Sequence, residues 1–230
     1  MVISQRYAAL AFRLVAVVLI VTGLVRLAGF FGEDGPVWTT FVFYTTQSNV
    51  LVLVWMIAMI VVTVRDIVRD GPRGLAAPWP RLGAVVMMAI TVTMLIYLVV
   101  LAPSAFIQAG DGYQPFTLTD DLVHIVTPCL AIADWFLFSP PGRLRWWDPL
   151  TWAIPPYAYL LWAFIRAGLG GDFGDGRRYP YPFMDVSQYG VAGVAFQIAV
   201  MSVTLIAFGY IFVWLDKLRA RAARRRAEIG

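Results

Sequence analysis

Residues 7–31 read YAALAFRLVAVVLIVTGLVRLAGFF, and Arg13 and Arg26 are the only charged side chains in this stretch. A helix needs about 20 mainly apolar residues to cross the hydrocarbon core of a bilayer, which is about 30 Å thick. The stretch is therefore predicted to be a transmembrane helix. A cleavable signal peptide is not expected, because Arg13 interrupts the apolar run and no small-residue cleavage site follows.

Five further stretches meet the same criterion, namely residues 41–64, 82–103, 119–138, 150–169 and 190–215. Segments rich in Pro, Gly and charge separate them. Hydrophobic residues make up 60% of the 230 residues and charged residues only 14%, whereas soluble domains have about 25% charged residues. The sequence predicts an all-α integral membrane protein of six transmembrane helices, forming a single domain over residues 1–216.

The distribution of Lys and Arg predicts the orientation in the membrane, since cytoplasmic loops are enriched in both. Thirteen of the 18 basic residues fall on the side that holds both termini, and only Arg177 and Arg178 fall on the other. Both termini are therefore expected in the cytoplasm. Residues 217–230 are predicted to form a basic tail that contacts anionic membrane lipids and no nucleic acid. Only Lys217 is a lysine, a bias that suggests a GC-rich bacterium and hence a multi-pass bacterial plasma-membrane protein.

Several chemistries are excluded by composition. The chain has one His and one Cys, too few for a zinc site, which normally needs about three such ligands. It has no phosphate-binding loop and no dinucleotide fingerprint. No metal and no cofactor are expected.

Polar residues predicted to lie within the membrane are candidates for function, because burying them in lipid is costly. Thr45, Ser48 and Asn49 share one helix face through their i, i+3 and i+4 spacing. Thr45 would lie about 6 Å below the outer end of its helix, and His124 about 8 Å below the outer end of another. The hydroxyl cluster and the only histidine are therefore expected at nearly the same depth, in the outer leaflet.

Other residues are predicted to gather at that level. Arg26 and Arg166 fall in the outer halves of their helices, and Asp120 and Asp121 lie one turn above His124. Pro128 lacks an N–H, so the carbonyl of His124 is expected to lose its helical partner. The aromatic residues of the loop 177–189, RRYPYPFMDVSQY, could fold over the mouth of such a site.

Structural explanations exist for each of these residues. Thr45 could bond its own i−4 carbonyl. Asp120 and Asp121 suit a helix N-terminus capped by Thr119, and the two arginines could extend outward to the interface. Cys129 is expected to be a small buried hydrophobic residue rather than a thiol nucleophile acting with His124. Asp134 is too deep to orient His124 and is predicted to pair with Arg13.

The chain resembles the androgen-induced-protein family of six-span membrane proteins, through its bacterial relatives. The resemblance rests on YTTQSN (residues 44–49), LVHIVTP with Asp134–Trp135, YAYLLWAFIRA (157–167) and YPF (181–183), in the same order over about three quarters of the chain. Characterised animal members hydrolyse fatty acid esters of hydroxy fatty acids with a threonine nucleophile and a histidine. The resemblance assigns those positions to Thr45 and His124. The chain departs from the family in having Asp120–Asp121 before the histidine and a proline four, not five, residues after it.

Two functions follow from these features. The first is an intramembrane hydrolase of lipid-like esters, with Thr45 as nucleophile and His124 as base, and with oxyanion- or substrate-binding candidates Ser48, Asn49, Arg26, Arg166 and Asp121. The second is a non-enzymatic lipid- or amphiphile-binding protein, or a transporter, that uses the same polar pocket. The sequence leaves the oligomeric state open, and it does not decide which of Thr45, Thr46 and Ser48 faces His124.

Overall fold

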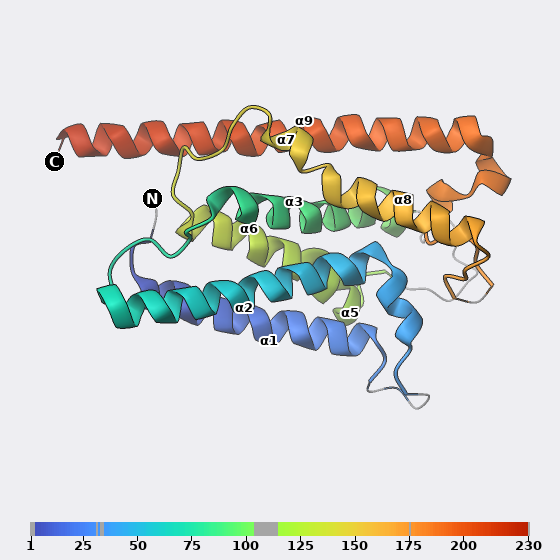
Figure 1. The fold of residues 1–230 in the computed structure, drawn as a ribbon, viewed down its shortest axis with the longest axis horizontal. Coiled ribbons are helices and arrows are strands. Elements are labelled where there is room, and N and C mark those ends of the chain that lie inside the picture. Colours follow the sequence, from blue (N-terminus) through green and yellow to red (C-terminus); the bar gives the residue numbers. More distant parts are fainter. Residues whose placement is uncertain (1–2, 31, 33–34, 104–114, 175, 230) are drawn as a thin grey trace.

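The computed structural model describes residues 3–30, 32, 35–103, 115–174 and 176–229. Figure 1 shows its long helices running side by side. The described residues form helices joined by turns, with no β-sheet among them. The connection between the third and fourth predicted spans, residues 104–114, lies outside the described part.

The helices follow the predicted stretches. They are α1 (Arg6–Leu27), α2 (Tyr44–Asp70), α3 (Pro80–Ile96), α5 (Leu118–Asp121), α6 (Thr127–Phe138), α7 (Asp148–Thr151), α8 (Ile154–Gly168) and α9 (Val186–Ile229). Two π-helical turns continue them, η2 (Tyr97–Leu101) after α3 and η3 (Leu122–Val126) between α5 and α6. Two 3₁₀ turns, η1 (Trp38–Val42) and η4 (Pro182–Met184), precede α2 and α9.

Five helical segments in the described part are long and apolar enough to cross a membrane. These segments are Arg6–Leu27, Tyr44–Asp70, Pro80–Leu101, Leu118–Phe138 and Val186–Arg225. Large apolar side chains cover their outer surfaces, among them Val18, Val61 and Phe196, which are 64%, 63% and 70% exposed. Apolar surface of this extent is what a lipid environment requires. The chain is an all-helical membrane protein.

The fifth predicted stretch, residues 150–169, is not one continuous helix. It is divided into α7 and α8, and α8 has 15 residues, or about 22 Å of helix. Pro155 and Pro156 lie in the first turn of α8, where a missing N–H leaves no helical hydrogen bond unmade. The two prolines therefore begin a new helix instead of bending a longer one.

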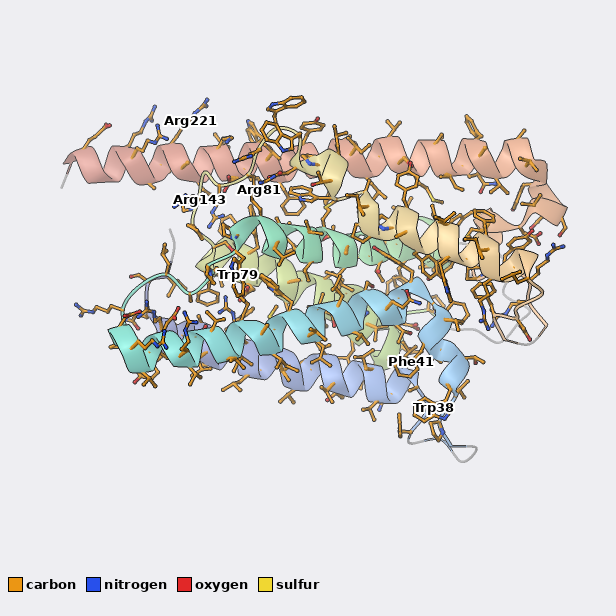
Figure 2. The ribbon with its side chains drawn as sticks, in the orientation of Figure 1. Trp38, Phe41, Trp79, Arg81, Arg143 and Arg221 are labelled. Carbon is orange, nitrogen blue, oxygen red and sulfur yellow. The ribbon has the colours of Figure 1, made fainter. Side chains whose placement is uncertain are left out.

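The start of α1 and the end of α9 lie at the same end of the bundle but on different sides of it (Figure 1). Figure 1 shows α9 along one edge of the bundle, with α8 beside it, and α1 and α2 at the opposite edge. Arg81, Arg143 and Arg221 lie toward the end of the bundle that holds both chain ends, whereas Trp38 and Phe41 lie at the other (Figure 2).

A buried ion pair joins α1 to α6. Arg13 Nε donates to Asp134 Oδ1 at 2.7 Å, and Arg13 Nη1 donates to Thr63 Oγ1 at 2.9 Å and to the Ala76 carbonyl at 2.8 Å. Arg13 is fully buried and Asp134 nearly so. The predicted pairing of Arg13 with Asp134 is confirmed.

The packed part of α9 extends beyond residue 216. Asp216 accepts hydrogen bonds from the Gly142 and Leu144 amides, and Lys217 donates to the Leu144 carbonyl. Arg219 donates to the Phe136 and Ser139 carbonyls. The first residues of the predicted tail therefore fasten α9 to the connection between α6 and α7.

Candidate functional site

Thr45 lies at the beginning of α2. Phe43 has extended backbone angles, so the helix starts at Tyr44 and Thr45 is its second residue. Its buried hydroxyl does not bond a carbonyl of its own helix. Instead, Thr45 Oγ1 lies 3.4 Å from His124 Nε2, within hydrogen-bond reach at its long end.

The neighbouring hydroxyls point elsewhere. Thr46 Oγ1 donates to the Thr40 carbonyl at 2.6 Å. Ser48 Oγ contacts Thr93 Oγ1 at 2.8 Å and the Thr45 carbonyl at 3.0 Å. Of the three hydroxyls that the sequence left open, Thr45 is the one that faces His124.

The hydrogen bond on the far side of the imidazole sets its tautomer. His124 Nδ1 lies 3.2 Å from the carbonyl oxygen of Asp120. Because a carbonyl can only accept, Nδ1 carries the proton in this contact and Nε2 is left as the acceptor of the neutral ring. His124 therefore presents a lone pair to the Thr45 hydroxyl.

Asp120 lies behind this histidine. Its carboxylate Oδ1 is 3.8 Å from His124 Nδ1, while Oδ2 accepts from the Thr117 hydroxyl at 2.8 Å. Thr117 and Asp120 form a capping box at the start of α5, so the predicted cap at Thr119 is wrong by two residues. The i, i+4 spacing of Asp120 and His124 is the sequence signal for this pairing, and it selects Asp120 rather than Asp121.

Two π-helical turns meet at the imidazole. Tyr97 begins η2, and its ring stacks on the His124 ring of η3, with the centroids 4.2 Å apart and the planes at 10°. The Tyr97 hydroxyl accepts from the Phe116 amide at 2.8 Å. π-helical turns are rare and occur often at functional sites. No feature of the sequence pointed to Tyr97.

Because Pro128 has no N–H, one backbone carbonyl in the preceding turn lacks a helical donor. The π-helical turn η3 changes which carbonyl this is. In this turn the Thr127 amide donates to the Leu122 carbonyl, five residues back. By the same register the partner of Pro128 is Val123, not His124 as predicted. Asn49 Nδ2 donates to the Val123 carbonyl at 3.0 Å and to the Thr45 carbonyl at 2.8 Å. Asn49 thus ties α2 to η3 and holds Thr45 opposite His124.

The remaining predicted residues lie at other places. Arg26 Nε donates to Thr119 Oγ1 at 3.2 Å on the exposed outer surface. Arg166 donates to the Asp172 carbonyl and lies over the Trp162 and Phe173 rings. Asp121 is half-buried beside the cap of α5.

Cys129 is exposed on the outside of the bundle, so the prediction that it is buried is wrong. Its thiol faces outward from α6, while the His124 imidazole is buried. The structure does not bring the two together.

Thr45 lines a cavity of about 60 Å³ between α2, α3, α8 and α9. Tyr44, Tyr159 and Tyr181 surround its Thr45 end, and Phe183 adds to the wall. Tyr181 and Phe183 belong to the loop 177–189, which contributes to the cavity as the sequence suggested. The role of Tyr181 beside the threonine was not predicted.

The Tyr181 hydroxyl lies next to the Thr45 side chain and the first backbone amides of α2. Burial raises the pKa of this phenol above its ordinary value, because desolvation disfavours the phenolate. Tyr181 is therefore a neutral hydrogen-bond donor over the physiological pH range.

Comparison of the chain with protein-family models, curated proteins and solved structures finds no match. The fold and site by themselves describe an all-helical membrane protein in which a threonine contacts a histidine, the histidine contacts an aspartate, and the threonine lines an apolar cavity.

Proposed function

We propose that the protein is an intramembrane hydrolase of lipid-like carboxylic esters. The observation that carries the proposal is the alignment of Thr45 Oγ1, 3.4 Å from His124 Nε2, with a His124 Nδ1 that is anchored 3.2 Å from the Asp120 carbonyl. A hydroxyl, a base and a group that orients the base are the parts of a nucleophilic hydrolase.

The reaction follows from the positions of these groups. Thr45 Oγ attacks the ester carbonyl while its proton passes to His124 Nε2. The resulting imidazolium gives that proton to the departing alcohol and leaves an acyl group on Thr45. A water molecule, deprotonated by the same nitrogen, then releases the acid and restores the threonine. The Asp120 carboxylate, 3.8 Å from Nδ1, stabilises the imidazolium in both steps.

The developing oxyanion needs donors that lie beside Thr45 and can turn from their present partners to the substrate. The Asn49 amide is bonded to two backbone carbonyls, and the two predicted arginines are bonded elsewhere. The Tyr181 hydroxyl and the N-terminus of α2 are next to Thr45, and a helix N-terminus favours negative charge. We assign the oxyanion to these two.

The proposal includes six membrane passages with both termini in the cytoplasm of a bacterium. The common end of α1 and α9 and the arginines near it support this orientation (Figures 1 and 2). The sixth passage would be the α7–α8 segment, residues 148–168. The proposal also includes relationship to the androgen-induced-protein family, supported by the order and spacing of its resembling segments.

The test is labelling of the purified protein by a fluorophosphonate probe, followed by identification of the modified residue. We expect labelling at Thr45 in the wild type, and its loss in Thr45→Ala and His124→Ala. Thr46→Val is the matched control, because Thr46 donates to Thr40 and does not face the histidine. Each variant is first shown to be folded by circular dichroism.

Labelling of Thr45→Ala at the wild-type level would contradict the proposal. A folded wild type that neither labels nor hydrolyses esters, and that retains a bound lipid through purification, would favour the lipid-binding alternative. The apolar cavity at Thr45 is compatible with that alternative.

A further inference from the structure

The cavity at Thr45 is too small to hold a long-chain ester. Its volume is about 60 Å³, whereas pockets that enclose a ligand are usually about 300–1,000 Å³. Any hydrocarbon chain attached to the reacting ester must therefore extend beyond the cavity.

A second hollow lies next to this cavity. It is a groove of about 270 Å³ between α3 with η2 and α9. Ile96, Met201 and Leu205 line both the cavity and the groove, so these three side chains, called the neck below, stand between the two hollows. Met is flexible and adapts to ligands of different shape, which suits a residue in a neck.

The groove is lined mainly by hydrocarbon side chains, and its polar lining residues are Gln197 and Thr204. Its α3–η2 side is lined by Leu95, Val99 and Val100 in addition to the neck. On the α9 side, Thr204 donates its hydroxyl to the Val200 carbonyl of its own helix. Phe196, which also lines the groove, is 70% exposed. A hydrocarbon chain bound in this groove would extend directly into the hydrocarbon core of the bilayer.

The opposite side of the cavity is closed. Tyr44 donates to the Ala89 carbonyl at 3.0 Å and Tyr159 donates to the Val42 carbonyl at 3.1 Å. The two rings are 5.2 Å apart and both residues are buried. They form a wall between the cavity and another surface hollow between α2 and α8.

We propose that the α3–α9 groove is the subsite for the acyl chain and the route by which that chain reaches Thr45 sideways from the bilayer. The proposal rests on the proposed hydrolase function. It adds that the groove determines which acyl-chain lengths the enzyme prefers. The residues that face the chain are Val99, Val100, Phe196 and Val200, with Met201 at the neck.

The test compares p-nitrophenyl palmitate with p-nitrophenyl acetate in detergent micelles. Val200→Trp places an indole in the groove without touching the Thr45 cavity, because Val200 lines only the groove. We expect the ratio of kcat/KM for palmitate over acetate to fall about tenfold or more. Val203→Trp, on the 69% exposed face of the same helix, is the matched control and keeps the wild-type ratio.

An unchanged ratio in Val200→Trp would overturn the groove assignment, even if both rates fell together. If the wild type cleaves neither ester, the hydrolase proposal fails and the groove is tested by binding. Alkyl-diazirine palmitate should then label residues 95–100 and 196–205, in competition with excess palmitate and less in Val200→Trp. Labelling that does not saturate, or that is equal in Val200→Trp, would overturn the groove.

Discussion

Two contacts restrain the imidazole of His124, a hydrogen bond at one ring nitrogen and an aromatic ring stacked on one face. The Asp120 carbonyl fixes its Nδ1 edge at 3.2 Å, and the Tyr97 ring covers one face at 4.2 Å between centroids. The first restraint sets the tautomer and the second sets the plane of the ring. In the proposed mechanism, His124 must keep both the tautomer and the ring plane to receive a proton from Thr45.

Tyr97→Leu is expected to lower the rate of ester hydrolysis on the order of tenfold, because small displacements of a catalytic group are costly. The stacked face is lost while the Asp120 bond remains. Tyr97→Phe keeps the ring and should retain most of the activity. The measurement is kcat for p-nitrophenyl acetate in both variants, and equal losses in the two would show that the hydroxyl, not the ring, matters.

Arg13→Met is expected to destabilise the protein by about 3–5 kcal/mol, since Asp134 is left as a buried charge without its partner. The double variant Arg13→Met, Asp134→Leu removes both charges and should recover most of the loss. The thermal unfolding midpoint in detergent measures both. A double variant no more stable than the single one would contradict this account.

At the scale of elements, the π-helical turn η3 explains how Pro128 affects the position of the His124 side chain. Pro128 cannot donate, and the π register together with the Asn49 amide satisfies the carbonyl it leaves open. The turn brings His124 against Tyr97 and Thr45. The sequence predicted an unpaired carbonyl near Pro128, but it did not predict the register, because the donor is on α2, 74 residues away.

Pro128→Ala restores an N–H and permits an ordinary α-helical register through residues 122–128. We expect a stably folded protein with reduced fluorophosphonate labelling at Thr45, because the imidazole turns away from it. Pro155→Ala is the control, as Pro155 is in the first turn of α8, where an N–H is not needed. Full labelling in Pro128→Ala would mean that the proline does not set the position of His124.

The stability of the first turn of α9 is predicted to depend on pH. The Ser187 hydroxyl and amide donate to Asp185 and lower the pKa of this carboxyl. A depressed folded-state pKa gives stabilisation that is present above the unfolded value, about 3.9, and is lost as the pH falls through the folded value. Hydrogen-exchange protection of residues 186–189 should therefore fall on acidification in the wild type but not in Asp185→Asn. A parallel fall in both would assign the effect to another group.

For the whole molecule, hydropathy predicted the positions of the long helices, since lipid imposes a strong and local requirement on composition. It did not predict the division between α7 and α8. The depth calculation placed Thr45 and His124 at one level, and the structure brings them within 3.4 Å. The sequence did not identify Tyr97 or Tyr181, because in an apolar chain it does not distinguish aromatic residues that face the site from those that face lipid.

The passage of the α7–α8 segment across the membrane is tested with single cysteines in a Cys129→Ala background. Trp146→Cys and Leu169→Cys place thiols at exposed positions on either side of that segment. We expect a membrane-impermeant maleimide to label Leu169→Cys in intact cells and Trp146→Cys only after permeabilisation. Labelling of both from one side would exclude the sixth passage.

The uninterrupted helix at the end of α9 places Arg219, Arg221, Arg224 and Arg225 at fixed positions along one axis. Gly190, with a φ of 65°, separates one short turn from the helix that continues to Ile229. A disordered basic segment could bring all its charges to the lipid headgroups, but a continuous helix that projects from the membrane cannot. Arg225 stands about 9 Å further along the axis than Arg219, about one Debye length at physiological ionic strength. In the proposed orientation, attraction to the anionic leaflet therefore decays along the helix, and its far turns remain available to the aqueous cytoplasm.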